Sequence, residues 1–253
     1  MKLTSYGKKE WTMSICIFIG YILFLILLLL LHILSLLTTV ILCFFGLFAC
    51  VAACAFFRDP ERIIPNLPNI MLAPADGMIR DIEMIKGEDI DSAPLKTLFE
   101  GKNVIRIGIF LSVFNVHLNR APWEMKVSFK EYKPGRYLDA RNKNASKENE
   151  SMLIGGIALL NEKKFPIAVR QISGAIARRI VCPVQPDDVL PKGFAYGMIK
   201  FGSRTELYIP CDMDFNILVK IGEPVTAGIT PMVEIPDSTE KKLSLLNMNL
   251  KQN

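Results

Sequence analysis

The sequence contains only two histidines and no recognisable metal-ligand spacing. His32 lies in a strongly apolar N-terminal stretch, so imidazole chemistry in the rest of the chain would have to use His117. Of the six cysteines, only Cys182 and Cys211 lie outside that stretch. Because no disulfide framework is evident either, the sequence argues against a domain held together by zinc or by disulfides.

Charge is missing from one long segment. No Asp, Glu, Lys or Arg occurs from Trp11 through Phe57, a run of 47 residues. As a helix, this run would extend roughly 70 Å at about 1.5 Å per residue, about twice the roughly 30 Å hydrocarbon core of a bilayer. A secretory signal has a much shorter apolar stretch. We therefore predict that residues 1–57 form a retained α-helical membrane hairpin with two spans.

Basic residues flank the apolar run on both sides. Three lysines precede it, and Arg58 and Arg62 follow it. With a turn near residues 32–39, the positive-inside tendency places both ends of the hairpin in the cytoplasm. This predicts a protein of the cell membrane whose residues 58–253 face the cytoplasm. A single long span with an interfacial extension is the competing topology, and it would put those residues outside.

Residues 58–253 are numerous enough for one domain with its own core. Their charges are nearly balanced, so nothing indicates nucleic acid as a partner. A proline-rich connector, Phe56–Asn69, precedes segments that alternate apolar and polar residues as strands do, at 104–112 and 125–132. Residues 151–174 resemble two strands joined by a four-residue loop at Asn161–Lys164. We predict that this domain is mainly β (α+β).

A faint internal repeat lies in the second half of the domain. The segments Val184–Gly193 and Val219–Gly228 share a Val, an acidic residue four positions later and a Gly nine positions later. Similar turns occur in hammerhead domains of the lipoyl and biotinyl type, so we expect hammerhead-like hairpins. Two unrelated hairpins with ordinary Pro/Gly turns are the simpler interpretation.

Three residues are candidates for catalysis. His117 follows a predicted strand in "FLSVFNVHLNRAP", within a cluster of polar residues that a core histidine would not need. Asp76 lies in "LAPADGMI", where Asp-Gly is first of all a turn signature, although an acid at a turn can orient an imidazole. Ser203 follows Gly202 in the strand-like run "GMIKFGSRTELYIP", where a Gly could also mark a β-bulge.

The Gly202-Ser203 pair permits self-cleavage chemistry. Because Gly202 has no Cβ, the Ser203 hydroxyl can reach the preceding carbonyl carbon, and the resulting acyl shift from N to O gives an ester. Elimination across Ser203 would break the chain and leave dehydroalanine. Hydration with loss of ammonia then leaves a pyruvoyl group, an electrophilic ketone that no standard side chain supplies.

The chain resembles the phosphatidylserine decarboxylases, particularly their short form, over nearly its whole length. The segments that carry the resemblance follow the family's order: the apolar leader ending in "FFRDPER", then "PADG", "FLSVFNVHLNRAP", "KENE", "QISGAIARRIV" and "GMIKFGSRTELYIP". The resemblance implies cleavage between Gly202 and Ser203 and a covalent pyruvoyl cofactor made from Ser203. It also implies that Ser203, His117 and Asp76 are the functional residues, and that chains 1–202 and 203–253 remain together as a heterodimer.

Two departures from the longer family form leave the base for self-cleavage open. That form has Leu-Gly-Ser-Thr at the cut, whereas here Arg204 separates Ser203 from Thr205. It also has two histidines in the segment matching "VHLNRAP", and Arg120 replaces the second one here. His117 would then serve both steps, or Asp76 or water would take one of them.

The expected reaction follows from the ketone. The amine of a serine headgroup condenses with the pyruvoyl carbonyl as a Schiff base, which accepts the electrons released when the carboxylate departs as carbon dioxide. His117 would reprotonate the α-carbon, and Arg120 would pair with the substrate carboxylate or phosphate, or serve as a structural arginine. The product would be phosphatidylethanolamine; archaetidylserine, an ether lipid with the same headgroup, is an alternative substrate.

Two other functions would use part of the same sequence. A membrane-anchored β-rich adaptor would explain the leader and the strands but not the Gly-Ser pair. A serine hydrolase would use Ser203, His117 and Asp76 for acyl transfer, but the Gly-x-Ser-x-Gly elbow is missing. Only the decarboxylase requires a self-cleaved chain.

Overall fold

The structure is a computed structural model that describes residues 2–136, 148–160, 163–174, 179–200 and 203–235. The chain divides into two compact units, Met1–Glu61 and Arg62–Asn253. The first unit is helical, and the second is built almost entirely from strands. The predicted class, a mainly β domain preceded by a helical hairpin, is confirmed.

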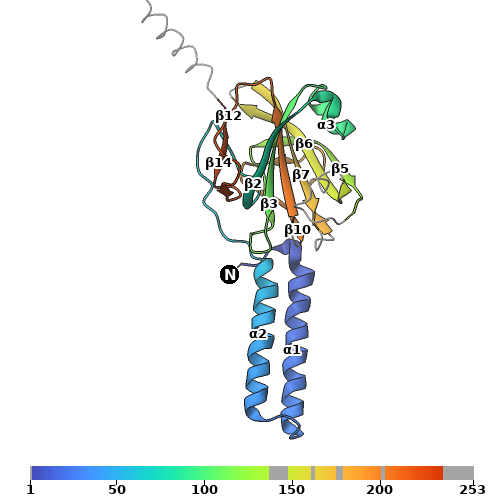
Figure 1. Cartoon of the computed structure of the whole chain (residues 1–253), viewed down its shortest axis with the longest axis vertical. Coiled ribbons are helices and arrows are strands. Elements are labelled where there is room, and N and C mark those ends of the chain that lie inside the picture. The colour runs from blue at the N-terminus through green and yellow to red at the C-terminus, as the bar shows by residue number, and fades with distance from the viewer. Residues whose placement is uncertain (1, 137–147, 161–162, 175–178, 201–202, 236–253) are drawn as a thin grey trace, which may run out of the picture. The chain divides into compact units, whose positions relative to one another are not determined.

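The first unit is an antiparallel pair of helices, α1 (Lys8–Leu30) and α2 (Leu36–Phe56), preceded by the short 3₁₀ helix η1 (Ser5–Gly7) (Figure 1). Both helices are long and apolar enough to cross a membrane. The turn between them ends at Ser35 rather than at Thr39, because the Ser35 hydroxyl caps α2 by accepting a hydrogen bond from the Thr38 amide at 3.2 Å.

The second unit is organised around one eight-stranded antiparallel sheet (Figure 1). Its order is β13 (Pro224–Val225), β2 (Gly77–Ile85), β3 (Val104–Leu111), β11 (Ser203–Pro210), β7 (Lys163–Ser173), β6 (Ser151–Leu160), β5 (Met125–Lys133) and β9 (Val189–Leu190). Strand β11 lies near the middle, paired with β3 on one side and β7 on the other.

The inner face of this sheet packs on two three-stranded sheets. One is β1 (Ile70–Leu72), β14 (Pro231–Glu234) and β12 (Asn216–Ile217); the other is β4 (Leu118–Arg120), β10 (Ala195–Lys200) and β8 (Arg179–Val181). The main core draws on all three sheets and includes Ile109, Leu207, Met71, Val233 and Tyr196. The large sheet is therefore curled over two small ones.

The outer face of the large sheet carries a second, smaller core. The 3₁₀ helix η2 (Gly87–Asp89) and helix α3 (Ala93–Leu98) follow β2. Leu95 of α3 packs there with Phe99, Leu153, Ala168 and Tyr208. The Ser92 hydroxyl caps α3 by accepting a hydrogen bond from the Leu95 amide at 3.2 Å.

Most of the predicted strands are present. Strands β3 and β5 cover the two alternating segments, and β6 and β7 form the predicted hairpin. The prediction of a four-residue loop at Asn161–Lys164 was wrong. Strand pairing continues to Leu160 and Lys163, so only residues 161–162 lie between the strands.

The weak sequence repeat corresponds to an internal two-fold pattern. Its two segments supply β9 and β13, which pair with β5 and β2 at opposite edges of the large sheet. Gly193 and Gly228 end the two segments with φ angles of 78° and 71°, a conformation that favours glycine. Reciprocal bonds join the halves: the Leu72 amide donates to the Pro122 carbonyl and the Arg120 amide to that of Pro74, both at 2.9 Å.

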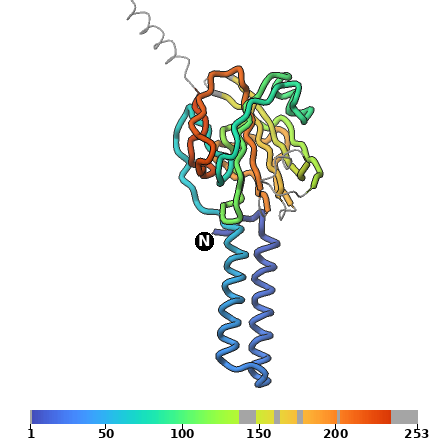
Figure 2. The backbone as a smooth tube through the Cα atoms, viewed as in Figure 1, coloured from blue at the N-terminus to red at the C-terminus, as the bar shows by residue number. Residues whose placement is uncertain are grey.

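The strands of the second unit divide into two similar halves. The small sheet β1-β14-β12 is the counterpart of β4-β10-β8, so each half contains one small sheet and four strands of the large one. The red C-terminal strands consequently lie beside the cyan segment that begins the second unit (Figure 2). Ser203 begins β11, so the predicted cut falls between β10 of a small sheet and β11 of the large sheet.

Candidate active site

Ser203 is the first residue of β11 and faces the core. It pairs with Leu111 on β3 and with Ser173 on β7. Its side chain is fully buried, and its Oγ atom has no hydrogen-bond partner among the residues that the structure describes. A buried hydroxyl without a partner is costly in a folded protein, so this position is a candidate for function. Gly202, the other half of the predicted cleavage site, lies outside the described residues.

A row of polar groups continues from Ser203 across the sheet. Ser173 is also fully buried, and in the described part of the chain its Oγ has no partner. The Asn149 Nδ2 atom donates to the Ser173 carbonyl at 2.7 Å, and the Ser173 amide donates to the Glu150 carbonyl at 2.9 Å. The buried Glu150 carboxylate accepts a bond from the Tyr132 hydroxyl at 3.2 Å.

These neighbours of Ser203 were not predicted as site residues. Asn149 and Glu150 belong to "KENE", and Ser173 belongs to "QISG", which served only as marks of resemblance. Folding brings them together from distant parts of the sequence: Ser173 pairs with Ser203 across the sheet, and the Ser173 amide bonds to Glu150, just before β6. Only the pairing of β7 with β11 could have revealed their proximity.

His117 reaches the same region from the small sheet. Its side chain is fully buried, and its Nδ1 atom lies 3.0 Å from the Asn115 carbonyl oxygen. The His117 carbonyl accepts a hydrogen bond from the Ile199 amide at 3.1 Å. Because Ser203 is four residues beyond Ile199, it lies within about 14 Å of Ile199 along the chain. His117 and Ser203 thus flank the same connection from β10 to β11.

A buried amide network holds the two strands in place. Asn119 Nδ2 donates to the Thr205 hydroxyl and Gln171 Nε2 donates to Asn119 Oδ1, both at 2.8 Å. Thr205 is two residues after Ser203, so the two lie on the same side of β11. Asn119 lies in β4, which begins directly after His117. Asn119 is one of the polar residues in the segment "FLSVFNVHLNRAP" that surrounds His117, whereas nothing in the sequence indicated Thr205 or Gln171.

Asp76 is held by an arginine. Its carboxylate accepts two bonds from the Arg62 guanidinium, at 2.7 and 2.8 Å, and one from the Ala227 amide at 2.8 Å. Arg62 also donates to the Ala227 carbonyl. The turn that carries Asp76 is joined to β4, because the Pro74 carbonyl accepts the Arg120 amide at 2.9 Å. That Asp76 orients the His117 imidazole therefore stays a prediction.

Arg120 is directed elsewhere. Its Nη1 atom donates to the Gly193 carbonyl at 3.0 Å. Side chains alternate along a strand, so Arg120 points away from the sheet that Asn119 contacts. This geometry favours the structural interpretation of Arg120, and its pairing with substrate stays a prediction.

Comparison with known proteins identifies the family of this chain. The chain matches the family described as "Phosphatidylserine decarboxylase" over residues 51–232. The chain belongs to the phosphatidylserine decarboxylase family. It is 38% identical to the phosphatidylserine decarboxylase proenzyme of Desulfotalea psychrophila over 218 residues, which cover 86% of this chain and 93% of that protein.

Two further relatives carry the same name. The phosphatidylserine decarboxylase proenzyme of Carboxydothermus hydrogenoformans is 41% identical over 175 residues, covering 69% of this chain and 76% of the relative. The phosphatidylserine decarboxylase proenzyme of a Wolbachia from Brugia malayi is 39% identical over 200 residues, which cover 78% of this chain and 82% of that relative. The resemblance noted in the sequence is therefore confirmed.

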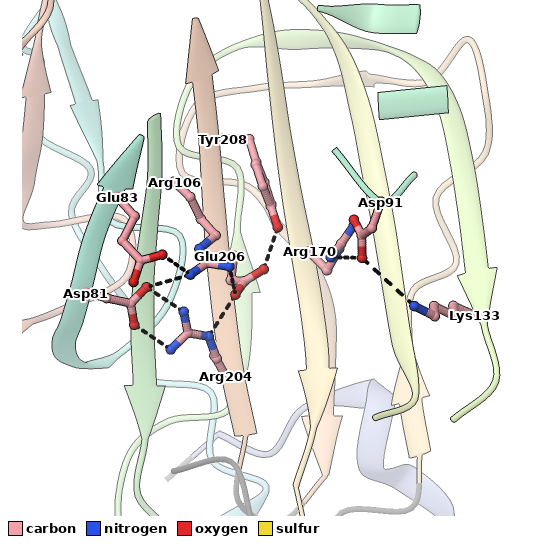
Figure 3. A network of polar contacts seen from close by, with 9 residues as sticks. All are labelled: Asp81, Glu83, Asp91, Arg106, Lys133, Arg170, Arg204, Glu206 and Tyr208. Atoms are coloured by element: carbon pink, nitrogen blue, oxygen red, sulfur yellow. Dashed lines mark hydrogen bonds and ion pairs between the residues drawn. The ribbon is translucent and has the colours of Figure 1, made fainter. Parts of the chain in front are cut away.

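The face of β11 opposite Ser203 carries an ionic network in this member of the decarboxylase family (Figure 3). Arg204 donates two bonds of 2.7 Å to Asp81 and one of 2.9 Å to Glu206. Arg106 lies 2.7 Å from Glu83 and 3.6 Å from Glu206. Arg204, the residue that departs from the longer family form, is thus anchored on the sheet directly after Ser203.

A second part of the network continues onto β7. Tyr208 donates its hydroxyl proton to Glu206 at 2.5 Å, and Arg170 makes two bonds to Asp91, at 2.7 and 3.1 Å (Figure 3). Glu206 is fully buried and Arg170 nearly so. Buried charges are tolerated only when they are paired, so this network fixes β11 between its neighbours.

The network sets the charge state of Asp81. Burial alone would raise the pKa of Asp81, but the bonds and charge of Arg204, together with Arg106, outweigh burial and lower that pKa below its ordinary value of 3.8. A lowered folded-state pKa stabilises the fold above the ordinary pKa. That contribution is lost as the pH falls through the folded-state value.

We expect Asp81→Asn to lower the free energy of unfolding by about 3 kcal/mol at pH 7, because it leaves the buried Arg204 without its main counterion. Asp187→Asn, which breaks an exposed pair with Lys126, is the matched control and should leave the free energy of unfolding close to that of the parent chain. Denaturation in detergent micelles, followed by near-ultraviolet circular dichroism, measures both. The difference between Asp81→Asn and the parent chain should shrink below pH 3.8; equal stability of the two variants at pH 7 would contradict a stabilising network.

Proposed function

We propose that this chain is a phosphatidylserine decarboxylase, which removes the carboxylate of the serine headgroup as carbon dioxide and yields phosphatidylethanolamine. Membership of the family and the names of the relatives support this function. A membrane-anchored adaptor is not favoured, because an adaptor has no use for a buried serine hydroxyl that has no partner among the described residues and lies at the start of a central strand.

The observation that carries the proposal is the environment of Ser203. Its buried Oγ has no hydrogen-bond partner in the described part of the chain, so it is available to attack the carbonyl carbon of the preceding residue. We infer that the chain cuts itself between Gly202 and Ser203 and that Ser203 becomes the pyruvoyl cofactor. A ketone at this position supplies an electrophile for the substrate amine and accepts the electrons released when the carboxylate departs.

The residues around Ser203 would assist in distinct ways. His117, beside the β10–β11 connection, is the candidate to move protons, both from the Ser203 hydroxyl and to the α-carbon after decarboxylation. Asn119, through Thr205, fixes the strand of His117 over β11. The inner face around Ser203 is buried, which excludes water and strengthens each polar interaction.

The two cleavage products would stay together. Strand β11 begins the second product, and all of its residues, Ser203–Pro210, are buried between β3 and β7. The second product also supplies β12, β13 and β14. Separating the chains would expose the main core, so we infer a stable heterodimer of residues 1–202 and 203–253.

The activity can be tested with the full chain in proteoliposomes that contain phosphatidylserine labelled at its carboxyl carbon. Labelled carbon dioxide should be released, and phosphatidylserine with a blocked amine should release none. A parallel preparation with the serine ether lipid determines whether the ether form is also a substrate. A fully cleaved preparation that releases no carbon dioxide from either lipid would contradict the proposed function.

We further propose that the catalytic unit faces the cytoplasm, because basic residues flank the two membrane-spanning helices on both sides. In spheroplasts of a bacterial expression host, external protease should leave the β domain intact, and permeabilisation should allow its digestion. Digestion before permeabilisation would favour the single-span topology.

A further inference from the structure

The turn between β3 and His117 presents apolar side chains at its tip. Asn115 Oδ1 accepts bonds from the Ser112 amide and hydroxyl, both at 2.8 Å, and the Asn115 amide donates to the Ser112 carbonyl at 3.0 Å. These bonds close the turn on its polar residues and leave Val113 and Phe114 at the tip, 44% and 84% exposed. Turns usually expose polar residues, so a rigid turn with an apolar tip is unusual.

This turn adjoins the candidate active site. Leu111, the last residue of β3, pairs with Ser203, and the turn begins at the next residue. At its other end, the Asn115 carbonyl lies 3.0 Å from Nδ1 of His117. The apolar tip is therefore connected rigidly to both the predicted nucleophile and the predicted proton donor.

A positive charge lies beside the same end of the sheet. The exposed Arg80 has its guanidinium carbon 5.7 Å from the ring centroid of Phe110, the residue before Leu111. An apolar tip next to an exposed cation matches the interface of a bilayer, where acyl chains lie below anionic phosphates.

We propose that residues 112–115 form a membrane-insertion turn, in which Val113 and Phe114 enter the acyl boundary of the bilayer and so hold His117 and Ser203 at the level of the headgroups. The proposal rests on the proposed function, because a phospholipid substrate makes the bilayer the occupant of this surface. A lipid that left the bilayer entirely would expose its acyl chains to water. An apolar turn at the mouth of the site lets the headgroup reach Ser203 while the acyl chains stay in the membrane.

The kinetic test uses the full chain in proteoliposomes and compares Phe114→Ser with Met84→Ser. Met84 is the matched control, since it is 62% exposed but lies near the other end of β2, six residues beyond the partner of Phe110. Phe114→Ser should raise the apparent KM for bilayer phosphatidylserine about tenfold, equivalent to about 1.4 kcal/mol. It should leave self-cleavage and turnover of monomeric short-chain phosphatidylserine unchanged, and Met84→Ser should change none of the three.

A second measurement reports insertion directly. Phe114→Trp should add fluorescence that brominated acyl chains quench, whereas the fluorescence added by Met84→Trp should be unaffected. Unquenched fluorescence from Phe114→Trp, or parent-like bilayer kinetics of Phe114→Ser, would overturn the proposal. If the parent chain released no carbon dioxide from either substrate, the proposed function would fail, but quenching would still decide whether the turn enters the bilayer.

Discussion

Replacing Ser203 by Ala should leave the chain uncut and abolish release of carbon dioxide. No hydroxyl would remain to attack the preceding carbonyl carbon, and no pyruvoyl group could form. The fold should survive, because the lost Oγ atom is buried without a partner in the described structure and its removal leaves no other group unsatisfied. Denaturing electrophoresis measures the uncut fraction, and release of labelled carbon dioxide measures activity.

Ser173→Ala is the matched control for this variant. Ser173 lies directly opposite Ser203, is equally buried and, like Ser203, has a hydroxyl without a partner in the part of the chain that the structure describes. We expect Ser173→Ala to be cut and active, since only Ser203 follows the scissile peptide bond. A cut Ser203→Ala chain would refute the assignment of the nucleophile, and an uncut Ser173→Ala chain would show that the two hydroxyls act together.

Replacing His117 by Ala should have the second largest effect, and it separates the two steps of the pathway. General acid-base assistance is typically worth about 10² to 10⁴ in rate. Because His117 is the only histidine outside the apolar leader, we expect both self-cleavage and carbon dioxide release to slow by factors in this range. The cleaved fraction over time and the turnover per cleaved chain give the two effects separately.

Asp76→Asn and the double variant with His117→Ala determine whether Asp76 acts through the imidazole. If Asp76 only orients His117, its replacement should have no further effect once the imidazole is gone. Asp76→Asn could also lower the rates of self-cleavage and decarboxylation in a second way, because Asn would remove the negative charge that pairs with the Arg62 guanidinium. If Asp76→Asn lowers the two rates by the same factor in the parent chain and in His117→Ala, Asp76 acts through its pairing with Arg62 and not through His117. Unchanged cleavage and release in His117→Ala would return His117 to a structural role.

The large features of the fold could be predicted from the sequence because they depend on local patterns. Length and the absence of charge were enough to predict two helices, and α1 and α2 lie where they were expected. The Ser35 cap, rather than hydropathy, decides where α2 begins. Alternation predicted β3 and β5, but periodicity contains no information about where a hairpin loop ends.

Strand β11 shows where pattern reasoning fails. The alternation of charged and apolar residues after Ser203 is typical of a half-exposed strand. Every residue of β11 is nevertheless buried, because Arg204 pairs with Asp81 on β2 and Glu206 pairs with Arg106 on β3. The run around Gly202 and Ser203 is also not one strand with a bend, since β10 and β11 belong to different sheets.

The candidate site could be predicted only in part, because local sequence patterns do not show which distant residues meet in the folded chain. The motifs indicated Ser203, His117 and Asp76, each recognisable by residue type and immediate context. Ser173, Glu150, Thr205 and Gln171 are ordinary residues in sequence, and they surround the site only because β6, β7 and β11 pair in one register. The partner of Asp76, Arg62, lies in the connector and depends on tertiary folding in the same way.

The most direct test of the central claim is the intact mass of the purified protein under denaturing conditions. We predict two chains, residues 1–202 and residues 203–253, whose masses sum to that of the precursor plus one water less one ammonia. The shorter chain should resist Edman degradation, because a pyruvoyl group replaces its amino terminus. A single uncut chain that still releases carbon dioxide from phosphatidylserine would contradict the account.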